Sequence, residues 1–164
     1  MSPRMSWVTS RSDPIVNAAA RAGVTLSIRR FSEGTRTAAD AARAVGCDIG
    51  QIVKSLVFVS DGEPVLALTS GSNRADPSRL AALLGATEVR RASADEARAS
   101  TGFAIGGTPP FGHAKRLRVL VDRDLLAWEV LWAAAGTPDT VFPIGPSELL
   151  AASGGEVSDL KQLD

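Results

Sequence analysis

The stretch QIVKSLVFVSDGEPVLALT, Gln51–Thr69, decides the fold class of this 164-residue chain. Its two apolar runs, 51–59 and 63–69, are rich in the β-branched and aromatic residues typical of strands. Between them, the sequence SDG at 60–62 favours a tight hairpin turn. The stretch therefore predicts two antiparallel strands, around which we place the rest of the chain.

Helices and further strands are expected on both sides of this hairpin. Capping residues and terminal glycines predict the helices, and apolar alternation predicts the strands. Helices are expected at 14–22, 38–45, 77–84, 94–101 and 146–152, and further strands at 24–31, 87–91, 116–122, 129–136, 140–144 and 155–160. The two element types mix without a strict βαβ rhythm, which indicates an α+β fold with a curved mixed sheet or barrel flanked by helices. We expect one domain over 13–164, preceded by a loose tail at 1–12.

Composition excludes several functional classes. Lys and Arg number 18 and so do Asp and Glu, so no global positive charge indicates a nucleic-acid binder, and phosphate contacts would need local patches. The single cysteine, Cys47, cannot form an internal disulfide and is expected to serve in packing. No apolar run is long enough to span a membrane, and the first residues lack the apolar centre of a signal peptide. We expect a cytoplasmic protein without membrane, metal or cofactor.

The segment TGFAIGGTPPFGH, Thr101–His113, is an unusual connector because it combines four glycines with two adjacent prolines. Glycines permit positive φ and close approach of a ligand, whereas prolines stiffen the chain and donate no hydrogen bond. The amides of Gly106, Gly107 and Thr108 could therefore hold an oxyanion or a ribose and phosphate edge. The alternative is a tight bend at a barrel corner, since Gly and Pro mark turns in many loops.

Lys54 is the second unusual feature, because it interrupts an otherwise apolar strand. Strand periodicity places it on the same face as Leu56 and Phe58, and places Ser55 on the opposite face. An ammonium group in an apolar cavity is costly unless it meets a partner or a ligand. The alternative is a lysine whose stem covers the core while its head reaches water.

Together these two features resemble the YbaK/EbsC family of aminoacyl-tRNA editing domains, which also occur inserted in bacterial prolyl-tRNA synthetases. GQIVKSLVF resembles the family's lysine strand, with the lysine at Lys54, and GFAIGGTPPFGH resembles its GxxxP loop, with the motif residues at Gly106 and Pro110. Residues 121–150 resemble its closing part, including the glycine at Gly136. One departure is the additional proline before Pro110, which removes an amide.

The resemblance implies a free-standing trans-editing deacylase that cleaves the ester of a small, wrong amino acid on tRNA for proline or a related tRNA. It implies attack by water, helped by the ribose hydroxyl of the substrate, with no covalent intermediate and no cofactor. The catalytic residues would be Lys54, Gly106, Gly107, Thr108 and Pro110. The alternatives are a non-catalytic module that binds tRNA or a synthetase, and a hydrolase of small esters or amides.

The other candidate residues would bind substrate or tRNA. Phe58, His113, Gly136 and Asp139 are the substrate-binding candidates, and Lys115 and Arg116 are the tRNA-binding candidates. His113 could instead fix the loop by bonding a carbonyl, and Asp139 could cap a turn. Lys115 and Arg116 could form a basic patch beside the loop that binds phosphate. The alternative is that they belong to an ordinary solvated strand edge. The arginine pairs at 29–30 and 90–91 are weaker candidates.

Overall fold

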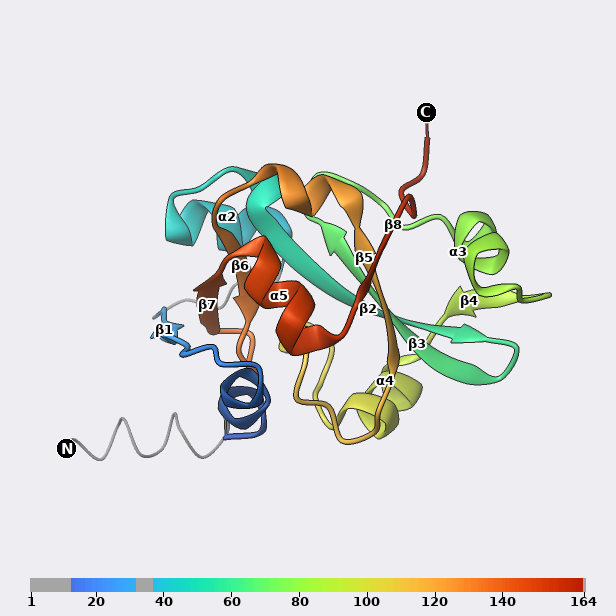
Figure 1. The fold of residues 1–164 in the computed structure, drawn as a ribbon, viewed down its shortest axis with the longest axis horizontal. Helices are drawn as coiled ribbons and strands as arrows, with labels where there is room; N and C mark the ends of the chain where they lie inside the picture. The colour runs from blue at the N-terminus through green and yellow to red at the C-terminus, as the bar shows by residue number, and fades with distance from the viewer. Residues whose placement is uncertain (1–12, 32–36, 164) are drawn as a thin grey trace.

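The computed structural model describes residues 13–31 and 37–163, so the expected tail at 1–12 lies outside the described residues (Figure 1). A helical segment at 13–21 comes first. The elements that follow are β1 (Arg29–Arg30), α2 (Ala38–Val45), the 3-10 turn η1 (Ile49–Gln51), β2 (Ile52–Ser60), β3 (Glu63–Ser70), α3 (Pro77–Leu84), β4 (Val89–Arg91), α4 (Ala94–Thr101), β5 (Arg118–Asp122), the 3-10 turn η2 (Arg123–Ala127), β6 (Leu131–Ala134), β7 (Thr140–Ile144), α5 (Pro146–Ser153) and β8 (Glu156–Ser158).

The strands of the described residues form one mixed sheet in the order β1-β7-β6-β2-β3-β5-β8, which confirms the expected α+β class. The hairpin at its centre pairs β2 with β3 over their whole length, from Val53 opposite Ser70 to Ser60 opposite Glu63. Asp61 and Gly62 both have positive φ, +47° and +87°, as a two-residue hairpin turn requires.

The other edge of β2 carries two separate partners. β6 pairs in parallel with Ile52 and Val53 at the start of β2, and β4 pairs antiparallel with 58–60 at its end. Among the described residues, no strand pairs with 54–56 on this edge. The sheet therefore has a gap beside Lys54.

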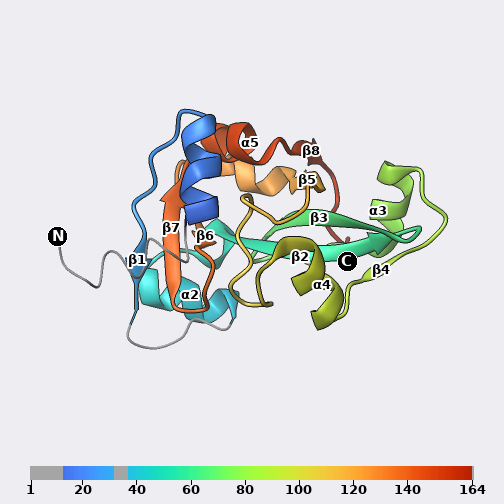
Figure 2. The ribbon, with the colours of Figure 1, turned by 90° about the horizontal axis from the view of Figure 1, so that it is seen from below.

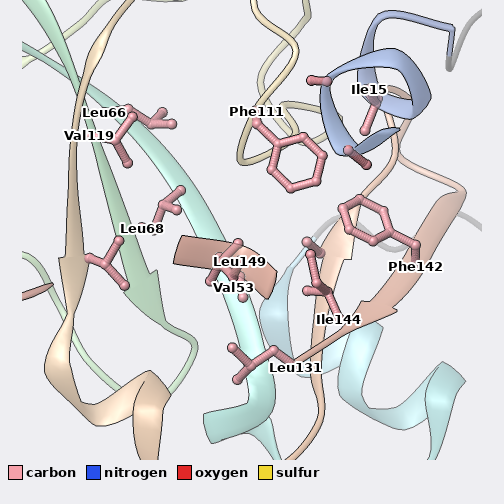
Figure 3. Packing of buried hydrophobic residues seen from close by; sticks show 14 of the residues in the cluster. Ile15, Val53, Leu66, Leu68, Phe111, Val119, Leu131, Phe142, Ile144 and Leu149 are labelled. Carbon is pink, nitrogen blue, oxygen red and sulfur yellow. The ribbon is translucent and has the colours of Figure 1, made fainter. Parts of the chain in front are cut away.

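Helices cover both faces of the sheet. Figure 2 shows β2 and β3 nearly edge-on, with α5 and the 13–21 helical segment on one side and α2 on the other. The first layer encloses the main apolar cluster, in which Ile15, Phe111, Phe142 and Leu149 pack together (Figure 3). The rings of Phe111 and Phe142 lie 5.7 Å apart at 55°. Phe111 belongs to the glycine- and proline-rich segment, so this packing anchors that segment to the core.

The strand expected at 24–31 is wrong over 24–28, since only Arg29 and Arg30 pair with β7. Val24, Leu26 and Ile28 pack against the main apolar cluster instead, so their alternation reflects core burial rather than a hydrogen-bonded ladder. No helix in the described residues has both the length and the apolar character that crossing a membrane requires.

Candidate active site

A cavity of about 500 Å³ lies at the gap in the sheet. The walls come from β2, α2, β4, β6 and from Ile105, Gly106 and Thr108 of the glycine-rich segment. Lys54, Gly106 and Thr108 all line it, so the two features singled out in the sequence meet at one hollow. Most of the remaining lining is apolar, including Ile52, Ala133 and Val141.

Lys54 enters this cavity half-buried, and its Nζ donates a hydrogen bond to the backbone carbonyl of Asn73. Burial lowers the pKa of Lys54, the positive charges of Arg74 and Arg91 lower it further, and the carboxylate of Asp122 opposes them. The ammonium group is thus held by a neutral acceptor, and its charge remains available to a ligand.

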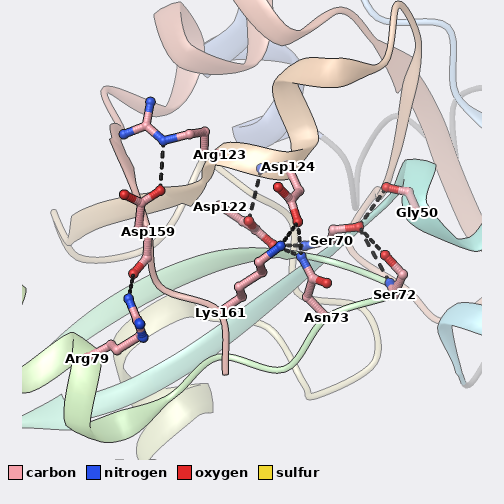
Figure 4. Close-up of polar contacts among 10 residues, drawn as sticks. All are labelled: Gly50, Ser70, Ser72, Asn73, Arg79, Asp122, Arg123, Asp124, Asp159 and Lys161. Atoms are coloured by element: carbon pink, nitrogen blue, oxygen red, sulfur yellow. Dashed lines mark hydrogen bonds and ion pairs between the residues drawn. The ribbon is translucent and has the colours of Figure 1, made fainter. Parts of the chain in front are cut away.

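A polar network holds Asn73, whose carbonyl accepts the hydrogen bond from Lys54. Figure 4 shows the Asn73 side chain between Asp122 and Asp124. Asp122 is 1% exposed and accepts hydrogen bonds from the Ser70 amide at 3.0 Å and from Asn73 Nδ2 at 2.8 Å. Asp124 accepts a second bond from Asn73 Nδ2 at 2.9 Å and pairs with Lys161 at 2.8 Å. The sequence carries only one signal of this support, an acidic residue at the end of the apolar run 118–122, and it does not predict these contacts.

The glycine-rich segment presents two unoccupied amides. No hydrogen bond within the described residues uses the amides of Gly106 or Thr108, whereas the Gly107 amide donates to the Ala104 carbonyl at 3.1 Å. The Thr108 hydroxyl also donates to Ala104, at 3.1 Å. Two of the three expected donors therefore remain for a ligand. Pro110, within the segment, is buried and does not line the cavity.

Gly107 and Gly136 connect the glycine-rich segment to the loop after β6 by close backbone contacts. The Gly136 amide donates to the Gly107 carbonyl at 3.0 Å, and a Cβ added at Gly107 would meet the Gly136 carbonyl oxygen at 2.8 Å. Gly136 itself has φ of +106°. Neither glycine lines the cavity, and each permits the close backbone packing of the segment. Their expected roles in catalysis and substrate binding stay predictions.

Asp139 and Phe58 also lie outside the cavity lining. Asp139 accepts a hydrogen bond from the Thr137 hydroxyl at 2.7 Å and lies 3.6 Å from the Arg30 side chain, as its turn-capping alternative predicts. Phe58 is 1% exposed within the second apolar cluster. The substrate contacts expected of both residues therefore have no support in the geometry.

His113, Lys115 and Arg116 line a separate depression of about 740 Å³. The ring Nε2 of His113 hydrogen-bonds the Pro109 carbonyl at 2.7 Å, and burial lowers its pKa. His113 therefore fixes the segment, which was its structural alternative, and does not reach the cavity. Arg118, in the same depression, pairs with Glu156 at 3.1 Å.

Ser55 and Arg91 line the cavity, although the sequence analysis did not place them there. Ser55 was expected on the face opposite Lys54, but the missing strand partner lets both sides of β2 border the hollow. Its Oγ is buried and has no hydrogen-bond partner in the described residues. Arg91 reaches the cavity from β4, whereas its neighbour Arg90 pairs with Glu96 at 2.8 Å.

Comparison with known proteins shows which family and which relatives this chain resembles. Residues 32–152 match the aminoacyl-tRNA editing domain family. A solved structure, described as a proposed trans-editing enzyme for prolyl tRNA synthetase, superposes with a TM-score of 0.87 at 43% identity over 99% of both chains. The chain is 25% identical over 131 residues, 79% of its length and 80% of the relative's, to EbsC of Enterococcus faecalis, a proposed Cys-tRNA(Pro)/Cys-tRNA(Cys) deacylase.

A third relative is the proline–tRNA ligase of Maridesulfovibrio salexigens, 34% identical over 108 residues. The match covers 65% of this chain but only 18% of the ligase. The lysine strand and the glycine-rich loop thus gave the correct family from sequence, and the chain belongs to the aminoacyl-tRNA editing domain family.

Proposed function

We propose that this protein is a free-standing hydrolase that cleaves the ester bond of a mischarged aminoacyl-tRNA. The observation that carries the proposal is the meeting of Lys54 with Gly106 and Thr108 at one largely apolar cavity. The family, and the activities proposed for EbsC and for the solved trans-editing structure, support the same function. Because charged tRNA is a cytoplasmic substrate, we place the protein in the cytoplasm.

The proposed reaction is direct attack by water on the ester carbonyl. The tetrahedral intermediate carries negative charge, which the free amides of Gly106 and Thr108 and the ammonium group of Lys54 would stabilise. A donor of this kind contributes about 3 kcal/mol to the stabilisation of such a transition state. The substrate's own ribose hydroxyl would help to position the water or to carry its proton.

The side chains near the cavity favour this route over a covalent intermediate. A serine nucleophile needs an adjacent base, and Ser55 Oγ has no hydrogen-bond partner in the described residues. His113 lies in the other depression, bonded to a carbonyl. Cys47 does not line the cavity, and burial raises the pKa of its thiol, so it is a poor source of thiolate.

The cavity suits the terminal adenosine with a small amino acid attached. Several of its lining side chains are short and apolar, such as Ala38, Ala133 and Ala134, beside larger apolar ones such as Trp132. One methylene changes discrimination in an apolar pocket by about 1–3 kcal/mol, so a pocket of this kind selects mainly by size. We propose that Lys115 and Arg116, outside the cavity, contact the phosphate backbone of the same tRNA near its acceptor end.

A panel of aminoacyl-tRNAs, incubated with the purified protein beside matched free amino-acid esters, tests this function. We expect release of a small amino acid from tRNA at a rate well above spontaneous hydrolysis, and slow turnover of the free esters. The K115E/R116E variant should raise KM for tRNA and leave the ester rates unchanged. Salt-sensitive tRNA binding without hydrolysis would instead identify a non-catalytic module, and equal rates on tRNA and free esters would identify a general esterase.

A further inference from the structure

The cavity borders both faces of β2, because the gap between β4 and β6 leaves this part of the strand edge open. Lys54 lines the cavity from one face. Strand alternation places Val53, Ser55 and Val57, which also line it, on the other face. Val53 and Val57 belong to the main apolar cluster, together with Phe111 of the glycine-rich segment. The cavity therefore has a second part on the side of this cluster.

The walls of this second part are short and uncharged. Its lining residues, which we call the inner compartment, are Ser55 with the apolar residues Val53, Val57, Ala92, Ala97 and Ala133. The two charged side chains of the cavity lining, Lys54 and Arg91, belong to the other face. Arg91 pairs with Phe58 across the strands, and its guanidinium carbon lies 5.5 Å from the centre of the Phe58 ring. The inner compartment therefore suits a small group without charge.

Ser55 carries the one unpaired hydroxyl of the cavity lining among the described residues. Three hydroxyl side chains line the cavity. Thr37 Oγ1 accepts a hydrogen bond from the Asp40 amide at 3.1 Å, and the Thr108 hydroxyl donates to the Ala104 carbonyl at 3.1 Å. Ser55 Oγ is buried and has no partner in the part of the chain that the structure describes. An unpaired buried hydroxyl is unfavourable, so a group bound in the cavity is its natural partner.

The proposed reaction would place the amino-acid side chain of the substrate beside Ser55. In that reaction the ester carbonyl lies at the free amides of Gly106 and Thr108. The segment that carries these amides is anchored by Phe111 to the same apolar cluster that borders the inner compartment. Because the side chain branches from the carbon next to the ester carbonyl, the inner compartment is the part of the cavity that receives it.

We propose that Ser55 is a specificity-determining residue whose hydroxyl hydrogen-bonds the side chain of the amino acid to be removed. This inference rests on the proposed function, and it names the substrate class as a small amino acid that carries a hydroxyl group. Such a side chain both donates and accepts hydrogen bonds, so it satisfies Ser55 Oγ. A methyl group in the same place leaves Ser55 unpaired. Seryl-tRNA is therefore preferred over alanyl-tRNA, although the two esters differ by a single oxygen atom.

The test compares hydrolysis of seryl-tRNA and alanyl-tRNA, both prepared on the same tRNA. For the unmodified protein we expect kcat/KM to be about tenfold higher for the seryl ester, the usual scale of one hydrogen bond. Ser55→Ala should bring this ratio close to one, mainly by slowing the seryl reaction. Ser55→Cys keeps a similar volume but hydrogen-bonds weakly, so it should lower the ratio as well. Ser60→Ala is the matched control, because Ser60 is buried on the same strand outside the cavity lining, and it should keep the ratio.

Thermal unfolding gives a readout of Ser55 that needs no substrate. S55A removes an unpaired buried hydroxyl, so its unfolding midpoint should equal or exceed that of the unmodified protein. A clearly lower midpoint would show that the hydroxyl already has a structural role, and would count against its assignment to the substrate.

The kinetic outcomes separate this inference from the proposed function. A ratio near one for the unmodified protein, or an unchanged ratio in S55A, would overturn the role of Ser55 while leaving the deacylase function in place. Equal slowing of both esters in S55A would also overturn it, because Ser55 would then act on a group that the two substrates share. Absence of any aminoacyl-tRNA hydrolysis by the unmodified protein would overturn both the function and the inference.

Discussion

Replacing Lys54 with alanine is expected to reduce the deacylation rate at least about 100-fold while the fold survives. The substitution removes the half-buried ammonium group of a residue that lines the same cavity as Gly106 and Thr108. Loss of one preorganised charge or donor at a developing oxyanion costs about 3 kcal/mol, which corresponds to this factor. The measurement is single-turnover hydrolysis of the preferred aminoacyl-tRNA, with thermal unfolding to confirm that the variant is folded.

The matched control is Arg43→Ala, which removes an exposed cation that pairs with Asp40 on α2. We expect its rate to equal that of the unmodified protein. A K54A rate equal to that of the control would remove Lys54 from the mechanism.

The pH dependence provides a second readout of Lys54. Its pKa lies below the ordinary value because of burial and two neighbouring arginines. The protonated form is the one that acts, so the enzyme-dependent rate should fall as the pH rises through this lowered pKa. The profile is measured after subtraction of spontaneous ester hydrolysis. K54A should lack this alkaline limb.

The second large effect is expected at Asp122, the buried carboxylate beneath Lys54. Asp122→Ala leaves the Ser70 and Asp124 backbone amides without their acceptor and removes one of the two acceptors of Asn73 Nδ2. Each unsatisfied buried donor costs about 1–3 kcal/mol, so we expect the free energy of unfolding to drop by about 3 kcal/mol or more. Urea denaturation measures this change directly.

The isosteric variant Asp122→Asn separates positioning from stability. It fills the same space but removes the negative charge that raises the pKa of Lys54. We therefore expect kcat to fall more than KM rises, and the alkaline limb to move to lower pH. Asp159→Ala, which breaks an exposed pair with Arg123, is the control and should change stability by less than about 1 kcal/mol. A D122N variant that is less stable but keeps the parental pH profile would leave Asp122 a purely structural role.

Much of the fold could be predicted because its signals are local. Thr37 and Ser93 accept hydrogen bonds from the first turns of α2 and α4, and Gly46 and Gly102 end those helices with positive φ, as their sequence positions indicate. The Asp-Gly pair at 61–62 likewise predicts the hairpin turn that the structure shows. These signals involve residues within four positions of one another, so a single sequence carries them.

The site was only partly predictable because its partners are distant in sequence. Strand periodicity identified Lys54. It did not identify the Asn73 carbonyl that accepts its hydrogen bond, or Asp122, which binds the Asn73 side chain. The sequence alone does not distinguish the roles of the neighbouring Arg90 and Arg91. The pairing of β4 with β2 places Arg91 at the cavity. Strand alternation placed Ser55 away from Lys54 because the gap between β4 and β6 has no sequence signature.

The central claim is that Lys54 and the glycine-rich segment bind the two sides of one aminoacyl-adenosine. The most direct test is a crystal structure with 3′-aminoacylamino-3′-deoxyadenosine, in which an amide replaces the labile ester. We predict that the amide carbonyl lies in the cavity between Lys54 Nζ and the backbone amides of Gly106 and Thr108. Binding of this compound in the depression around His113, with the cavity beside Lys54 left empty, would contradict the account.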